Sequence, residues 1–99
     1  MGEYKEIFRL KEMLEGEGIP FEWKELDGVL LDGFQICYPS RDAELVCSVI
    51  EHRFSYGGPA DKLEIMGLLT KEEKKTDGVL GWLSAEEVFG RIRKHWEAA

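Results

Sequence analysis

Apolar residues recur every three or four positions in two stretches of the chain, which is typical of helices that bury one face. The first stretch spans residues 4–15, and Gly16 follows it as a stop signal. Its shared face carries Ile7, Leu10 and Leu14. We therefore predict an amphipathic helix near the N-terminus.

The second periodic stretch lies close to the C-terminus and carries its own start signal. Ser84 and Glu87 have the spacing of a capping box, in which each residue bonds to the backbone of the other. The apolar stripe after them consists of Ala85, Val88, Phe89, Ile92 and Trp96. Acidic residues come first and basic residues last, which suits the helix dipole. The pattern predicts a helix over residues 85–97.

Alternation of apolar and polar residues predicts three strands, over residues 21–26, 34–38 and 45–56. Pro39 ends the second strand, because proline has no N–H to donate. The third strand is apolar on both faces in its first half. In its second half only the side carrying Phe54 and Tyr56 stays apolar, so we expect this end to run out toward solvent.

Three further segments are less regular. Residues 60–69 predict a helix with Leu63, Met66 and Leu69 in register, after the turn at Gly57-Gly58-Pro59. Thr70 with Glu73 forms a second capping-box pattern. Residues 79–83 are either a small strand or a buried connector. Residues 29–31 are either a very short strand or part of an irregular connection.

These elements predict a single domain over residues 1–99 in the α+β class. The expected architecture is a small antiparallel sheet of about three strands packed on one face by helices. The expected order is α-β-β-β-α-α.

Composition and charge narrow the class of function. The 99 residues are 43% hydrophobic and 33% charged, which is typical of a folded soluble chain. The net charge is −7, and residues 1–32 carry nine acids against four bases. Proteins that grip phosphate backbones usually show a basic patch, so direct nucleic-acid binding is not expected. The acidic N-terminal third either serves solubility or imitates nucleic acid toward a basic partner.

The sequence gives no sign of a membrane segment, a metal site or a cofactor. No apolar run approaches the roughly 20 residues of a membrane span, and the N-terminus lacks a signal-peptide pattern. Cytoplasmic localisation is therefore expected. Cys37 and Cys47 are too few for a disulfide scaffold, and we expect buried, reduced thiols.

Candidate chemistry centres on the stretch EHRFSYGG, residues 51–58. On a strand, Glu51 and His52 point to opposite faces and cannot act as a pair. Ser48 and His52 share a face, but four residues of strand separate them by about 13 Å. No catalytic residue is therefore predicted, and no enzyme.

A ligand pocket is conceivable where this strand emerges from the sheet. It would use His52, Arg53, Tyr56 and Gly57. The glycine turn lacks the spacing of phosphate-binding motifs, however, and a plain strand-to-helix turn explains it as well.

Aromatic residues make up 11% of the chain, and we expect most of them in the core. Tyrosine and tryptophan are also typical hot-spot residues of protein interfaces. Trp23, Tyr38 and Tyr56 are the interface candidates, for a protein partner of unknown identity or for a homodimer.

Two segments, EHRFSYGGPADKLEIMGLLT and GWLSAEEVFGRIRKHWE, carry a resemblance. They resemble small acidic proteins encoded by phages and prophages of Firmicutes, to which no activity is assigned. The resemblance implies an intracellular accessory protein. With it, we expect a non-enzymatic protein that acts by protein–protein interaction and modulates a host factor. A small-molecule or nucleotide binder with a pocket at residues 52–58, and a structural homodimer, are the alternatives.

Overall fold

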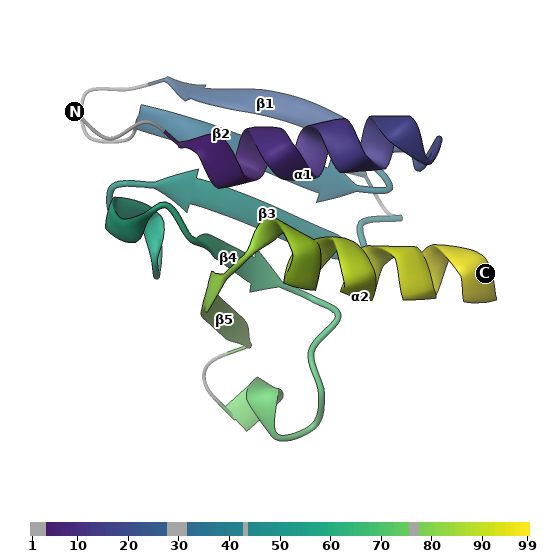
Figure 1. Ribbon diagram of the computed structural model, residues 1–99. Helices are drawn as coiled ribbons and strands as arrows, with labels where there is room; N and C mark the ends of the chain where they lie inside the picture. The colour runs from purple at the N-terminus through teal and green to yellow at the C-terminus, as the bar shows by residue number, and fades with distance from the viewer. Residues whose placement is uncertain (1–3, 28–31, 43, 76–77) are drawn as a thin grey trace.

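A computed structural model describes residues 4–27, 32–42, 44–75 and 78–99. Two helices lie on the same side of one antiparallel sheet, with their N-terminal ends toward the same end of the molecule (Figure 1). The helices are α1 (Lys5–Gly16) and α2 (Ala85–Ala98). The strands are β1 (Glu22–Asp27), β2 (Asp32–Tyr38), β3 (Cys47–His52), β4 (Leu63–Met66) and β5 (Val79–Leu83). Short 3₁₀ turns occupy η1 (Gly58–Ala60) and η2 (Glu73–Lys75).

The sheet is a meander in which neighbours in sequence are neighbours in space, in the order β1-β2-β3-β4-β5. Every pair is antiparallel. The register aligns Trp23 with Ile36, Ile36 with Val49, and Val49 with Ile65. This row faces the helices and forms the floor of the core.

The core lies between that floor and the two helix stripes. The predicted helices near the N-terminus and the C-terminus are confirmed within one residue at each end. The fully buried helix residues are Ile7, Leu10, Leu14, Ala85, Val88 and Ile92. The capping box at Ser84 and Glu87 is present with both of its hydrogen bonds, at 3.1 and 3.2 Å. Trp96, expected in the buried stripe, is instead 42% exposed near the end of α2.

The helix expected over residues 60–69 is wrong, because its central part is strand β4. Leu63 and Ile65 are fully buried under the helices, while Met66 is 59% exposed on the other face. Gly67 then follows at φ +102°, and a Cβ there would overlap the Val46 carbonyl. The alternating burial along β4 is that of a strand, and Gly67 turns the chain after it. The α+β class holds, but the sheet has five strands rather than three.

Other boundaries also differ from expectation. Residues 79–83 form β5, the small strand of the two alternatives. The strand expected over residues 45–56 is shorter in the structure. It spans Cys47–His52, because the chain turns at residues 53–56. The element order is therefore two helices around five strands, α-β-β-β-β-β-α. The predicted segment 29–31 lies outside the described residues.

The second face of the sheet is not covered by either described helix (Figure 1). It carries Gln35, whose Nε2 donates to Ser48 Oγ at 2.9 Å, and Glu64 and Met66 of β4. This side will be called the open face.

Substitution at two adjacent positions of β4 tests its two-sided character. We expect Ile65→Asp to unfold the protein, because an unpaired buried charge costs several kcal/mol against a total stability of about 5–15 kcal/mol. Met66→Asp should change the free energy of unfolding by less than about 0.5 kcal/mol. Circular dichroism with urea titration measures both. Equal damage from the two variants would contradict the assignment of β4.

Candidate functional site

His52 is the last residue of β3, and its side chain hydrogen-bonds the backbone two residues further along the chain. Its Nδ1 accepts a hydrogen bond from the Phe54 N–H at 3.1 Å, which requires that nitrogen to be unprotonated. Burial lowers the pKa of His52, and the nearby Glu64 opposes that effect only in part. His52 therefore closes the following turn as a neutral imidazole.

Ser55 makes the turn after His52 compact. Its Oγ donates to the His52 carbonyl at 2.8 Å and accepts from the His52 N–H at 3.0 Å. Its backbone N–H also donates to the His52 carbonyl, at 3.1 Å. Gly57 follows at φ +98°, which favours glycine. The turn is held by its own hydrogen bonds, which favours one conformation.

The predicted ligand residues His52, Arg53, Tyr56 and Gly57 all belong to this turn. Arg53 is exposed, with its guanidinium 5.9 Å from the centre of the Phe54 ring. The two pockets described below lie elsewhere in the molecule. A ligand pocket at residues 52–58 stays a prediction.

Of the three predicted interface residues, Tyr38 is buried and Trp23 is partly buried against the core. Trp23 stacks on Phe34 with ring centres 5.2 Å apart, and Phe8 of α1 lies 5.1 Å away. Tyr38 is 1% exposed, and its hydroxyl hydrogen-bonds His95 Nδ1 at 2.8 Å. Of the predicted set, Tyr56 presents its ring most fully to solvent.

Tyr56 is one of several strongly exposed apolar side chains among the described residues. The most exposed are Phe54 (64%), Trp82 (63%), Tyr56 (61%) and Met66 (59%). We call Phe54, Tyr56 and Trp82 the aromatic surface. Sequence reasoning missed Trp82, because a simple alternation in residues 79–83 would place it on the same face as Leu80.

A shift in strand register explains the exposure of Trp82. Leu63 pairs with Leu83 but Ile65 pairs with Leu80, so β5 carries an irregularity between them. Trp82 sits there at φ +61°, a left-handed conformation that costs a non-glycine residue about 1–3 kcal/mol. Leu80 and Leu83 thereby keep their contacts with the core while Trp82 turns outward. The strained backbone conformation therefore occurs at the residue whose ring is exposed, Trp82.

The turn at residues 53–57 is seated directly on β4 and β5. The Trp82 N–H donates to the Tyr56 carbonyl at 3.1 Å, and Glu64 Oε1 accepts from the Tyr56 N–H at 2.7 Å. Gly81 lies so close that a Cβ there would overlap the Cβ of Tyr56. These contacts join Tyr56 to Trp82 although 26 residues separate them in sequence.

The charges around the aromatic surface are of mixed sign with exposed cations at its edge. Arg53 and Lys62 are both exposed, and the backbone N–H of Lys62 donates to the Gly57 carbonyl at 2.9 Å. Glu64, the nearest acid on β4, is engaged by the Tyr56 N–H. Arg53 is the cation next to the Phe54 ring, and Lys62 interacts electrostatically with Glu86 at the start of α2.

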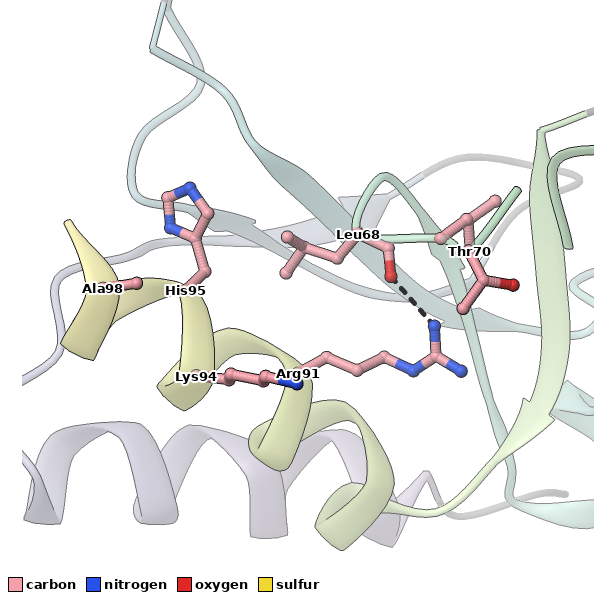
Figure 2. Close-up of a pocket in the computed structure, with 7 residues that line it drawn as sticks. Leu68, Thr70, Arg91, Lys94, His95 and Ala98 are labelled. Atoms are coloured by element: carbon pink, nitrogen blue, oxygen red, sulfur yellow. Dashed lines mark hydrogen bonds between the residues drawn. The ribbon is translucent and has the colours of Figure 1, made fainter. Parts of the chain in front are cut away.

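A pocket of about 560 Å³ lies between the second half of α2 and residues 68–70 (Figure 2). Arg91 reaches across it and donates to the Leu68 carbonyl at 2.9 Å. Both guanidinium ends also bond the Glu73 carboxylate at 2.8 Å, which lowers the pKa of Glu73 to about 2. Arg91 therefore fastens residues 68–73 to α2, and its charge is already matched.

A second pocket, of about 450 Å³, lies on the other side of His95. Pro20, Tyr38, Val46 and Trp96 contribute to its wall. The described contacts of His95 are the hydrogen bond and an edge-on ring contact with Tyr38. Tyr38 and His95 therefore lie hydrogen-bonded to each other in the wall of this pocket.

The cysteines are buried thiols, as the sequence predicted. Burial raises the pKa of Cys47 to about 12 and raises that of Cys37, so both stay protonated. Within the ranges that the structure describes, no group of three or more histidine, cysteine, aspartate or glutamate side chains could hold a metal. No described helix is long and apolar enough to cross a membrane.

Comparisons with known proteins add no assignment. Searches against protein-family models, curated proteins and solved structures each found no match.

Two glycine substitutions test how the aromatic surface is built. Gly81→Ala should destabilise the protein by about 1–3 kcal/mol, because the new methyl group overlaps Tyr56. Gly90→Ala is the control: its Cβ meets nothing within 4 Å in α2, and it should stabilise by about 0.5–1 kcal/mol. Urea unfolding followed by far-UV circular dichroism measures both. A neutral Gly81→Ala variant would contradict the seating of Tyr56 on β5.

Proposed function

We propose that this protein acts by binding another protein, without catalysing a reaction, and that the aromatic surface is its contact site. The observation that carries this proposal is the display of Phe54, Tyr56 and Trp82, each more than 60% exposed. Exposed apolar clusters on small soluble folds commonly mark interaction sites. Tryptophan and tyrosine are among the side chains that contribute most to protein interfaces.

The rigidity of the surface supports a binding role. Ser55 and His52 close the turn, and the Trp82 N–H holds the Tyr56 carbonyl. A site that is ordered before binding loses less conformational entropy when a partner docks. The left-handed backbone of Trp82 fits the same role, because strain of this kind concentrates at functional sites.

The size of the surface favours a short segment of a partner over a second copy of this chain. Aromatic side chains present about 150–250 Å² each. The exposed parts of the three rings therefore offer on the order of 400 Å². Stable interfaces bury about 800 Å² on each partner. We infer a peptide-sized contact, and a homodimer becomes the less favoured alternative.

The charges favour a segment that combines apolar side chains with acidic ones. Arg53 and Lys62 flank the rings, and an acidic residue of the partner could pair with either. The proposed partner is therefore an acidic, apolar segment of another protein.

The small-molecule alternative gains less support. A pocket at residues 52–58 would need the His52 imidazole, yet its Nδ1 already accepts from Phe54. The resemblance to phage and prophage proteins adds a context to the interaction proposal. In that context the partner is a host protein whose action this chain modifies.

Selection of peptides from a random display library on the immobilised full chain tests the proposal. We expect selected peptides to carry acidic and apolar residues. Trp82→Ala and Tyr56→Ala should each weaken their binding about 30-fold, since a hot-spot aromatic contributes about 2 kcal/mol.

Trp96→Ala is the matched control, because Trp96 is a partly exposed tryptophan on α2. It should leave peptide binding unchanged. Peptides that bind the Trp82→Ala and Tyr56→Ala variants as well as the original chain would contradict the assignment of the site. A failure to select any peptide, together with a mass that doubles with concentration, would favour the homodimer instead.

A further inference from the structure

Two carboxyl groups from distant parts of the chain hold the first turn of α1. Asp61 Oδ1 accepts from the N–H groups of Lys5 at 2.8 Å and Glu6 at 3.0 Å. Glu51 Oε1 accepts from the N–H of Ile7 at 3.1 Å. Tyr4, which precedes the helix, makes no side-chain capping bond. The N-terminus of α1 is therefore capped through tertiary contacts.

Glu51 is the unusual member of this pair. It is 0% exposed, on the helix side of β3. Its Oε2 is buried and, taken as an ionised oxygen, has no hydrogen-bond partner among the described residues. An unpartnered buried charge is costly, so this oxygen needs a different explanation.

Asp61 supplies that explanation. Asp61 Oδ1 and Glu51 Oε1 accept from consecutive N–H groups at the start of α1, which places the two carboxyl groups next to each other. Two carboxylates cannot bond to each other unless one of them carries a proton. With a proton on Oε2, Glu51 donates to Asp61 and accepts from Ile7, and both of its oxygens are satisfied.

We propose that Glu51 is a carboxylic acid in the folded protein at neutral pH, and that Glu51 and Asp61 share this one proton beneath α1. The site is built to hold a proton and not a cation, since three backbone N–H groups already point into it. No metal-binding group of three acidic, histidine or cysteine side chains occurs in the described ranges.

The charges around Glu51 favour the protonated form. Asp61 faces it from the segment between η1 and β4, and Glu6 faces it from α1. Lys5 of α1 acts on Asp61, and Phe34 lies opposite Glu51 on β2. Glu6 also accepts from the Ala85 N–H at the start of α2 and pairs with Arg9, which in turn pairs with Glu86.

The pKa values of the pair move in opposite directions. Burial, followed by the hydrogen bond with Asp61, raises the pKa of Glu51 from 4.5 to about 9, while the Ile7 N–H opposes this. Burial of Asp61 also disfavours its charge, but hydrogen bonds from Glu51 and from the backbone of Glu6 and Lys5 lower its pKa overall. Asp61 is thus the carboxylate of the pair and Glu51 the acid.

This arrangement makes stability depend on pH in a defined direction. Between the ordinary pKa of 4.5 and the folded value of about 9, only the folded chain keeps the Glu51 proton. Unfolding then releases one proton, so the unfolding equilibrium constant rises about tenfold per pH unit. The contribution of Glu51 is fully present below the lower value and is lost as the pH rises to the upper one.

Glu51→Gln tests the proposal, because a neutral amide can donate to Asp61 and accept from Ile7 at every pH. The unfolding constant of the original chain, divided by that of the variant, should rise about a thousandfold over about three pH units between pH 5.5 and 8.5. Taking this ratio cancels the titration of the histidines and other groups. Glu25→Gln is the matched control, since Glu25 is an exposed carboxylate in the same row of the sheet. Its ratio should stay constant. A constant ratio for Glu51→Gln as well would overturn the proposal.

Infrared difference spectroscopy of the unsubstituted protein gives a second test that survives if the variant fails to fold. We expect a carboxylic-acid carbonyl band at neutral pH that is replaced by a carboxylate band above about pH 9. If the spectrum at pH 7 contains no band of a protonated carboxyl group, Glu51 is ionised and the shared proton does not exist.

Discussion

Strand β4 pairs with β3 on one side and with β5 on the other, and these two pairings organise the rest of the molecule. They place Leu63 and Ile65 beneath the helices and extend the sheet far enough to seat α2 beside α1. The same pairings bring β5 against the turn that follows β3. Without them, Tyr56 and Trp82 would not lie on one surface.

Local signals explain why the two helices were predictable and β4 was not. Apolar residues at helical spacing mark both helices in the sequence. The capping-box residues Ser84 and Glu87 additionally mark the start of α2. In residues 63–69, by contrast, apolar residues occur at both helical and strand spacing, and only pairing with neighbours decides between them. Gly67 was the available sign, because a glycine inside a predicted helix often marks a turn or a close backbone approach.

The surface was predictable only in part, for a similar reason. Tyr56 was expected at the solvent end of β3 and is exposed there. Trp23 and Tyr38 have the same residue types, but their environment depends on α1 and α2, which the local pattern does not place. Trp82 depends on a register shift, and Glu51 on its position under α1 beside Asp61. These features come from tertiary contacts between distant segments.

The central claim is that the turn after β3 rests on β5 and thereby fixes Tyr56 beside Trp82. Nuclear Overhauser spectroscopy of the folded chain tests this most directly. We expect a strong cross-peak between the Tyr56 β-protons and the Gly81 α-protons, together with slow hydrogen exchange at the Trp82 amide that donates to Tyr56. The absence of that cross-peak, with fast exchange at the Trp82 amide, would contradict the account.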